Sequence, residues 1–253
     1  LCRRKNGQNW RHDWINRSFM QTEEQLPQTR TFESGLDFIE RNAAYDRWFL
    51  QIEAFDPHEP FYTQGDYKKP YPDDYHGKNL DWPDYGKNEY GEEATRHVRY
   101  EYAALLSMCD HSLGRLLDKM DELDMWKDTM LIVNTDHGFL LGEHGWWAKS
   151  MMPYYNEIAH IPMFIWDPRS KVQGERRSSL VQNIDMAPTI LTYFGLEPTK
   201  DMLGKSLEQT VKDDTPVWRY ALYGSHGNHI NITDGRYVYM LCPQAGKAPT
   251  SIP

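Results

Sequence analysis

The sequence is poor in several features that mark particular classes of protein. It has only three cysteines among 253 residues, at positions 2, 109 and 242, and their spacing fits no metal-binding template. It contains no apolar run of about 18 residues, so we expect no transmembrane helix. No signal peptide, internal repeat or low-complexity tract is recognisable in it. These absences exclude a small disulfide-stapled scaffold and a repeat array.

Clusters of positive charge are also scarce. Lys and Arg number 28 against 37 Asp and Glu, which gives a formal net charge of −9. The basic clusters at residues 3–5 and 176–177 are short. A nucleic-acid surface gathers many cations on one face, because each contact neutralises a phosphate. We therefore expect no nucleic-acid partner.

Patterns typical of strands and helices alternate along most of the chain. The residue types predict strands over 48–55, 130–134 and 161–166, and helices over 32–42, 93–123, 153–158 and 185–191. In the longest helix, apolar residues from Val98 to Leu123 recur every three or four positions and mark one buried face. This order predicts an α/β fold in which a mixed, mostly parallel sheet is flanked by helices.

The pattern changes after Pro198. Short strands are predicted over 219–223, 230–233 and 237–241, and Asp234-Gly235 is a strong hairpin signal. We therefore predict two domains. Residues 1–197 form part of an α/β domain, and residues 198–253 begin a small antiparallel subdomain that is truncated.

Residues 62–92 are rich in Tyr, Asp, Pro, Lys and Gly and lack periodicity. Long loops of this kind in compact domains are often functional or mobile. The chain as a whole has 16 Tyr and 9 Trp, which suit either stacking on sugar rings or ordinary packing. Trp146 and Trp147 are the first candidates for a stacking surface.

Side chains suited to binding a metal follow two of the predicted strands. Asp136 and His137 come directly after the strand at 130–134, and His58 follows the strand at 48–55. Lys149 lies beyond a loop punctuated by glycines. A carboxylate and an imidazole bind a cation, and a nearby ammonium group suits an anionic ester such as a sulfate or phosphate. Because ligands gather beyond the carboxyl ends of strands in such sheets, we expect these side chains to converge.

Six motifs occur in the order found in the sulfatase family, within the alkaline-phosphatase-like superfamily, and the chain resembles that family over most of its length. They are Asp56-Pro57-His58-Glu59-Pro60-Phe61, Asp110-His111-Ser112-Leu113-Gly114, Asp136-His137-Gly138, Gly142-Glu143-His144-Gly145 with Lys149, Asp185-Met186-Ala187-Pro188-Thr189, and Gly204-Lys205-Ser206-Leu207. His137 and Trp147-Ala148-Lys149 are most similar to the iduronate-2-sulfatase-type branch.

The resemblance implies a role for each matching residue. Asp136 and His137 would ligate a calcium ion, while Lys149 and His58 would contact the sulfate, and either of these two could supply a proton to the leaving alcohol. Negative charge builds on the bridging oxygen as the S–O bond breaks, and a cation and a lysine stabilise it there. The substrate implied is a sulfated small molecule or glycan. The family's members are mostly periplasmic, extracellular or lysosomal.

The family's nucleophile is formylglycine, made from Cys or Ser in a Cys/Ser-x-Pro/Ala-x-Arg motif, and no such motif occurs here. The family's paired N-terminal aspartates are missing as well. We therefore expect the chain to be the C-terminal portion of a sulfatase. Alone it would be inactive and would bind calcium poorly.

Three further residues are candidates for supporting the site. His144 and Trp147 lie in or beside the glycine-rich lysine segment, and His229 lies in the predicted subdomain. Each would either orient a neighbouring group or touch substrate. His144 is equally compatible with an ordinary loop residue, and a polar turn is the favoured interpretation of His229.

Two alternatives to a sulfatase remain open at the level of sequence. A phosphonate or phosphodiester hydrolase of the same superfamily shares the metal and loop motifs. A sulfatase-like protein that has lost catalysis and only binds its ligand is the second. The nucleophile segment distinguishes all three possibilities.

Overall fold

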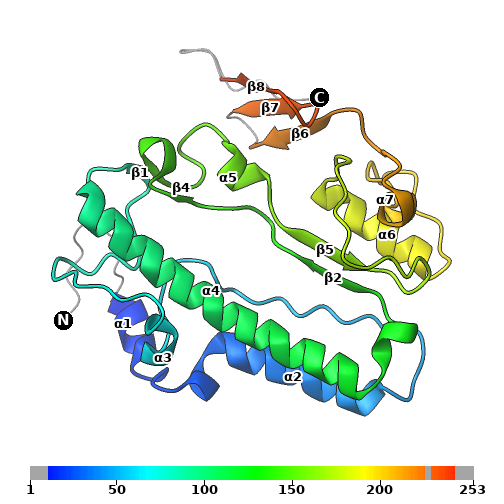
Figure 1. The fold of residues 1–253 in the computed structure, drawn as a ribbon, viewed down its shortest axis with the longest axis horizontal. Helices are drawn as coiled ribbons and strands as arrows, with labels where there is room; N and C mark the ends of the chain where they lie inside the picture. Colours follow the sequence, from blue (N-terminus) through cyan, green and yellow to red (C-terminus); the bar gives the residue numbers. More distant parts are fainter. Residues whose placement is uncertain (1–10, 226–228, 243–253) are drawn as a thin grey trace. The chain divides into compact units, whose positions relative to one another are not determined.

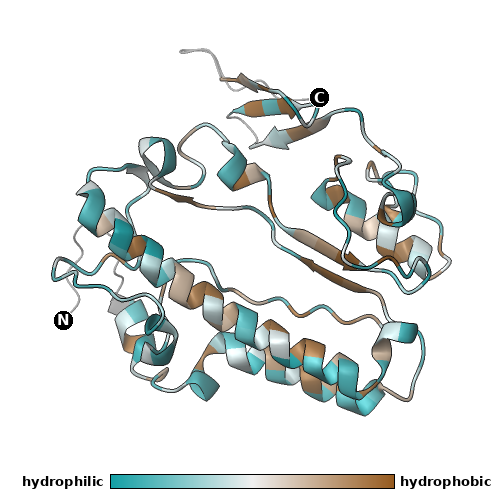
Figure 2. Cartoon of the chain, viewed as in Figure 1, coloured by the Kyte–Doolittle hydropathy of each residue, from teal (hydrophilic) through white to brown (hydrophobic). Residues whose placement is uncertain are grey.

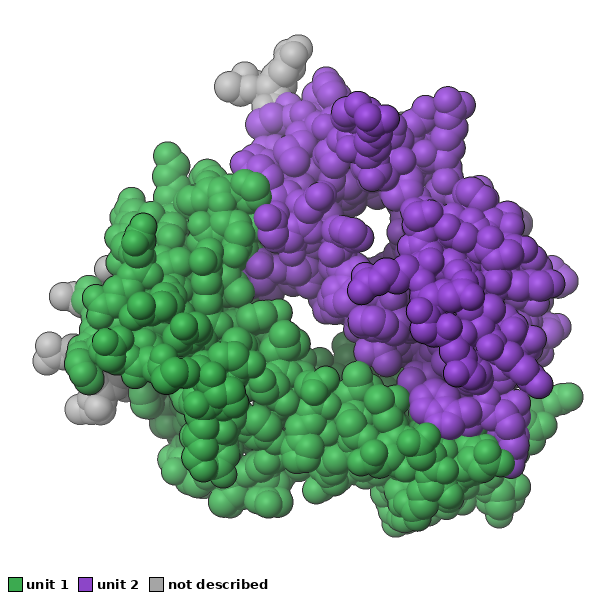
Figure 3. Space-filling view, viewed as in Figure 1, with its two compact units in different colours: residues 1–125, 140–148 green, residues 126–139, 149–253 purple. Residues whose placement is uncertain are grey.

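The computed structural model describes residues 11–225 and 229–242. It divides into two compact units (Figure 3). Unit 1 comprises residues 1–125 and 140–148, and unit 2 comprises residues 126–139 and 149–253. The domain boundary predicted at residue 197 lies inside unit 2, and that division stays a prediction. Within the described part of the chain, no helix is both long and apolar enough to cross a bilayer.

Unit 1 is built mainly from helices. Its elements are α1 (Arg11–Arg17), η1 (Glu23–Gln25), α2 (Pro27–Asn42), α3 (Gly65–Lys68), β1 (Gly86–Lys87), α4 (Gly91–Glu122), β3 (Leu140–Leu141), η3 (Glu143–Gly145) and β4 (Trp146–Ala148). The long helix α4 confirms the prediction over 93–123, and it packs along α2 (Figure 1). Its apolar stripe forms the core of the unit, with Val98, Leu105 and Met108 fully buried.

The segment predicted as a strand over 48–55 has no strand partner among the described residues. Its side chains nevertheless alternate between exposed and partly buried along residues 48–55. Phe49 is 58% exposed and Phe55 is 64% exposed. Ile52, on the covered side, packs on Gly35 so closely that a Cβ there would lie 2.4 Å from its Cδ1. The period-two pattern of burial is therefore present, but a β-strand also needs a neighbouring strand to which its backbone can hydrogen-bond.

Unit 2 carries two separate sheets. Its elements are β2 (Leu131–Asn134), α5 (Asn156–Ala159), β5 (Met163–Trp166), η4 (Asn183–Asp185), α6 (Met186–Tyr193), α7 (Glu208–Asp213), β6 (Ala221–Gly224), β7 (Ile230–Thr233) and β8 (Val238–Leu241), while η2 (Met125–Lys127) lies at the junction with unit 1. The combination of helices and sheet, and the small antiparallel sheet β6-β7-β8, confirm the predicted α/β class with its antiparallel C-terminal part.

The apolar strands β2 and β5 pair with each other, but antiparallel (Figure 2). Leu131 lies opposite Trp166 and Asn134 opposite Met163. The sequence predicted a mixed, mostly parallel sheet without assigning partners, and every strand pair in the described residues is antiparallel. A parallel pair needs a crossover that carries the chain back to its starting edge, usually a full helix. The connection between them, residues 135–162, is long enough for a crossover, but it contains β3, β4 and the four-residue helix α5 in place of one long helix.

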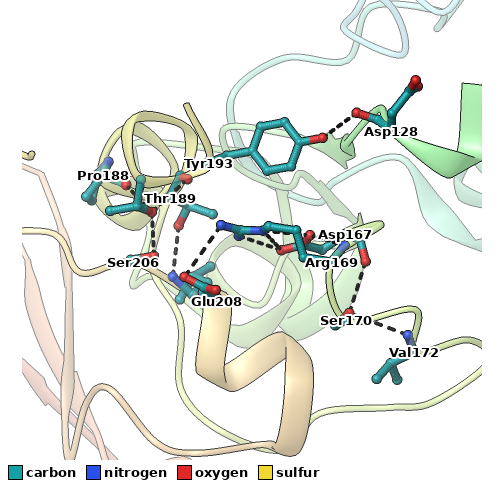
Figure 4. A network of polar contacts seen from close by, with 12 residues as sticks. Asp128, Asp167, Arg169, Ser170, Val172, Pro188, Thr189, Tyr193, Ser206 and Glu208 are labelled. Carbon is teal, nitrogen blue, oxygen red and sulfur yellow. Dashed lines mark hydrogen bonds and ion pairs between the residues drawn. The ribbon is translucent and has the colours of Figure 1, made fainter. Parts of the chain in front are cut away.

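The end of β5 is fixed to the helices that follow it (Figure 4). Asp167 is 1% exposed and accepts hydrogen bonds from Arg169, whose Nη2 lies 2.6 Å from Oδ2. The Arg169 guanidinium also lies over the ring of Tyr193 on α6, 5.0 Å from its centroid, and 3.5 Å from the Glu208 carboxylate on α7. One arginine therefore connects β5, α6 and α7.

Candidate active site

The turn after β2 holds the two predicted metal ligands. The His137 backbone N–H donates to Asp136 Oδ1 at 2.8 Å. His137 Nδ1 donates to the Gly138 carbonyl at 3.0 Å, and this acceptor fixes the proton on Nδ1. The other ring nitrogen, Nε2, lies 3.4 Å from Asp136 Oδ2, and the two side chains are 40% and 80% exposed. An imidazole nitrogen and a carboxylate oxygen thus lie close together on an exposed turn.

The turn depends on a close approach at Gly138. Its N–H donates to the Ile158 carbonyl at 2.8 Å. A Cβ at this position would lie 1.8 Å from the Glu157 carbonyl oxygen, which no side chain can tolerate. Glycine is therefore required for the Asp136-His137 turn to rest against α5.

Asn183 holds the same turn from the other side, and no pattern in the sequence singled it out. Its side-chain amide donates to the backbone carbonyl of Asp136 at 3.1 Å and lies 3.4 Å from that of Thr135. The one available signal was its position two residues before the Asp185 motif. Asn183 fixes the backbone that carries both predicted ligands.

Asp185 organises the segment from which Asn183 projects. It is fully buried, and its carboxylate accepts the backbone N–H groups of Gln182 and Lys205, each at 2.8 Å, and the Trp218 indole N–H at 2.9 Å. Gly204 is pressed against Ile184, since a Cβ there would lie 1.9 Å from its carbonyl oxygen. Two of the motifs, at 185–189 and 204–207, are therefore one structural unit.

Lys149 belongs to unit 2, directly after β4. Its ammonium group lies 5.8 Å from the centroid of the Phe139 ring. Phe139 follows the Asp136-His137-Gly138 turn without a break. The lysine is thereby placed beside the segment that carries the metal-ligand pair.

His58 belongs to unit 1, where its ring is held by neighbouring groups. Nδ1 donates to the Glu59 carbonyl at 2.6 Å and lies 3.3 Å from Glu59 Oε2, while the Phe55 ring packs on the imidazole with centroids 4.3 Å apart. The side chain is 33% exposed. Burial raises the pKa of the adjacent Asp56 carboxyl to about 6.

Glu59 and Tyr85 complete this arrangement, and neither was predicted to have a role. Glu59 is 1% exposed, and its Oε1 accepts the Tyr85 hydroxyl. Burial and this hydrogen bond raise the pKa of Tyr85. The sequence did offer one indication of a role for Glu59, because it places a carboxylate next to a histidine in a loop with two prolines. The Glu59 backbone carbonyl fixes the proton-bearing nitrogen of His58, and the Glu59 carboxyl group lies beside the ring.

The three supporting candidates differ in their surroundings. His144, in unit 1, is exposed and has a left-handed backbone with φ of 55°. Trp147 is 0% exposed in the middle strand β4, with its ring 5.9 Å from that of Tyr90. The Trp147 ring is packed in the interior, which favours the orienting role over direct contact with substrate, and its role stays a prediction. Trp146 is only partly buried and is the better placed of the two for stacking on a sugar ring.

His229, in unit 2, precedes β7. Its backbone carbonyl accepts the Ser225 N–H at 3.2 Å, and its Nδ1 is buried with no hydrogen-bond partner among the described residues. The neighbouring His226 lies outside the described residues. A role for His229 at the site stays a prediction.

The predicted residues are thus divided between the units. Unit 2 gathers Asp136, His137 and Lys149, while His58 belongs to unit 1. In the ranges that the structure describes, no group of three or more His, Cys, Asp and Glu side chains is arranged to hold a metal. The pair at 136–137 offers one carboxylate and one imidazole nitrogen, whereas calcium takes roughly six to eight oxygen ligands, so the pair fits only part of such a site. The convergence of all four residues stays a prediction.

Comparison with known proteins gives the family. A family model described as Sulfatase matches residues 1–196. An arylsulfatase from Clostridium perfringens is 24% identical over 247 residues, covering 88% of this chain and 50% of its own length. An N-acetylglucosamine-6-O-sulfatase from Bacteroides thetaiotaomicron is 35% identical over 126 residues, covering 49% of this chain and 22% of its own.

A solved structure shows the same fold. The phosphonate monoester hydrolase from Silicibacter pomeroyi superposes with a TM-score of 0.73 at 21% identity, covering 87% of this chain and 52% of its own. The chain spans about half the length of the arylsulfatase and of this hydrolase. With more than half of its residues matched by the family model, the chain belongs to the sulfatase family.

Proposed function

We propose that the full-length protein is a sulfuric ester hydrolase that acts on a sulfated carbohydrate. One observation in the structure carries the proposal: Asp136 Oδ2 and His137 Nε2 lie 3.4 Å apart on an open turn. That spacing suits two ligands of a single cation, since calcium–ligand distances are about 2.3 to 2.6 Å. The similarity to an N-acetylglucosamine-6-O-sulfatase supports a sulfated sugar as the substrate class.

Asp136 and His137 are the residues that would hold calcium, and Asn183 would keep their backbone in place. When bound, calcium would neutralise charge on the sulfate oxygens, and a formylglycine from a segment outside these 253 residues would supply the nucleophile. Both groups are properties of the family, and their presence in this protein is part of the proposal.

Lys149 and His58 would act on the charge that the reaction creates. As the S–O bond to the alcohol breaks, the electron pair stays on the alcohol oxygen, and an ammonium group stabilises it there. With Nδ1 bound to the Glu59 carbonyl, His58 would donate a proton to that oxygen from Nε2. The Glu59 carboxylate, 3.3 Å from Nδ1, would help to hold the ring in the orientation needed for this transfer.

Hydrolysis of 4-nitrophenyl sulfate by the full-length protein tests the proposal. We expect turnover that a chelator abolishes and calcium restores, and a loss of at least about a hundredfold for Asp136→Ala and Lys149→Ala. Asp201→Ala, at an exposed aspartate of unit 2, is the matched control and should retain full turnover. Unchanged turnover in both site variants would reject the assignment. Hydrolysis of a phenylphosphonate ester without hydrolysis of the sulfate would favour the phosphonate hydrolase alternative.

A further inference from the structure

A cavity of about 380 Å³ opens in unit 1, between the loop that follows α3 and the first half of α4. Its lining includes three tyrosines, Tyr71, Tyr75 and Tyr100, and charged side chains among which are Asp73 and Glu101. None of its lining residues belongs to the predicted active site. The loop is part of the 62–92 stretch whose composition predicted a functional or mobile excursion. The volume lies in the range of about 300 to 1,000 Å³ that is usual for small-ligand sites.

The aromatic rings of the cavity are held in place. The Tyr71 hydroxyl is hydrogen-bonded to Ser107 Oγ at 2.9 Å, and its ring lies 6.2 Å from that of Tyr100. Tyr75 stacks on His97 with centroids 4.3 Å apart and planes at 22°. Rings fixed in this way lose little conformational freedom when a ligand binds, and their faces are apolar surfaces that complement the C–H face of a sugar ring.

The charged side chains of the lining are paired, which sets the kind of ligand. Lys68 bonds Glu101 at 2.5 Å, and His97 bonds Asp73 at the same distance. Lys69 lies 2.6 Å from Asp66, which is next to the lining but not part of it. Because both lysines of the lining are paired with carboxylates, the cavity has no unpaired lysine to attract a sulfate or phosphate. A carboxylate oxygen has more than one lone pair and still accepts hydrogen bonds from hydroxyl groups.

From these observations we infer that the cavity is a carbohydrate subsite that binds a neutral sugar unit. Hydroxyl groups of the sugar donate to Asp73 and Glu101, and its C–H face rests on the ring of Tyr100 or Tyr71. This inference rests on the proposed function in one respect, that the neutral unit belongs to the same glycan whose sulfate ester is cleaved. It adds a specificity element for the chain surrounding the sulfated unit, carried by the loop that follows α3.

Calorimetric titration of the full-length protein tests the inference directly. The probes are an unsulfated N-acetylglucosamine tetrasaccharide and an unsulfated glucose tetrasaccharide. We expect at least one to bind. Tyr100→Ala should weaken that binding at least tenfold, and Tyr100→Phe, which keeps the ring, should stay within about threefold of the wild type. Tyr45→Ala, at a tyrosine of unit 1 that is 70% exposed and outside the cavity, is the matched control and should bind normally.

Asp73→Asn provides a second variant, because it preserves shape and should fold if Tyr100→Ala does not. It should weaken binding at least fivefold, since an amide presents one acceptor oxygen in place of two. Failure of both probes to bind the wild type would overturn the inference. Wild-type affinity in both Asp73→Asn and Tyr100→Ala would also overturn it. If Tyr100→Ala does not fold, wild-type affinity in Asp73→Asn alone is enough to overturn it.

Kinetics separates this inference from the proposed function. With a 6-O-sulfated N-acetylglucosamine tetrasaccharide, Tyr100→Ala should raise KM at least fivefold, while kcat for 4-nitrophenyl sulfate stays unchanged. Binding of the unsulfated probes without hydrolysis of any sulfate ester would refute the sulfatase proposal and leave the subsite standing. Hydrolysis of the sulfate ester, together with unchanged binding of the unsulfated probes by Tyr100→Ala and Asp73→Asn, would support the sulfatase proposal and refute the subsite.

Discussion

The side-chain amide of Asn183 donates a hydrogen bond to the backbone carbonyl of Asp136 across 3.1 Å. A residue with no metal-binding chemistry thereby supports the backbone of the predicted metal-ligand pair. The carboxylate of Asp136 is 80% exposed, so little else restrains the turn from the solvent side. The orientation of both ligands depends on contacts made through η4.

The first prediction concerns this contact. Asn183→Ala should raise the calcium concentration for half-maximal sulfatase activity by about 10- to 100-fold, because groups that orient ligands typically have effects of that size. Titration of activity with calcium measures it. Asn16→Ala, at an exposed asparagine on α1, should leave the calcium requirement unchanged. A normal calcium requirement in Asn183→Ala would show that the turn holds its shape without this support.

Asp185 carries the second prediction, which is about stability. Asp185→Ala should lower the free energy of unfolding by about 3 to 5 kcal/mol, because it leaves the N–H groups of Gln182, Lys205 and Trp218 without their acceptor in the interior. Asp185→Asn keeps one oxygen and should lose less. Urea unfolding measures both, with exposed Asp201→Ala expected within about 0.5 kcal/mol of the wild type. Equal stability of Asp185→Ala and the control would contradict the assigned role.

Glu59 allows a prediction about proton transfer. Glu59→Gln should slow hydrolysis of an alkyl sulfate about 10- to 100-fold, because it replaces the carboxylate that lies 3.3 Å from Nδ1 and helps to orient the His58 ring for proton transfer. Hydrolysis of 4-nitrophenyl sulfate should change much less, since 4-nitrophenolate leaves without a proton. His58→Ala should show the same division between substrates. Equal losses on both substrates would argue that Glu59 has a structural role only.

The fourth prediction follows from the pKa of Asp56, which burial raises from 3.8 to about 6. A carboxyl group with a raised pKa in the folded state stabilises the fold below its unfolded pKa, and this contribution is lost as pH rises through the folded value. Stability should therefore fall between about pH 4 and pH 7, by up to about 3 kcal/mol from this group.

Asp56→Asn tests that relationship because it is uncharged at every pH. Its free energy of unfolding should exceed that of the wild type at pH 8, and the difference should vanish near pH 4. Denaturant titrations at a series of pH values measure both. Parallel pH profiles for the two proteins would mean that Asp56 ionises in the folded state at its ordinary value.

The sequence predicted local structure well where a periodic pattern decides it. The three- and four-residue spacing of apolar side chains predicted α4 to within two residues at each end, because that spacing follows from the helix itself. Asp234-Gly235 predicted the β7–β8 hairpin. Gly235 there has φ of 87°, and the Asp234 carboxylate accepts the N–H groups of Arg236 and Tyr237.

The sequence predicted less about contacts between distant segments. Nothing in the pattern of residues 131–134 or 163–166 specifies whether the two strands run parallel or antiparallel. Only the tertiary structure shows that β2 pairs antiparallel with β5. The burial of Trp147 and the role of Glu59 depend on neighbours far away in the chain, Tyr90 and Tyr85. Such contacts cannot be predicted from the separation of two residues along the chain or from their residue types.

The order of motifs from His58 to Lys205 and the chemistry of Asp136, His137 and Lys149 are properties of the sequence, because side-chain type alone sets which groups bind cations and anions. Tertiary structure decided which atoms meet. It brought Asn183 to the Asp136 turn, and it grouped the tyrosines after α3 with α4 around one cavity. These relationships depend on distances between backbones that are remote in sequence, and only folding sets those distances.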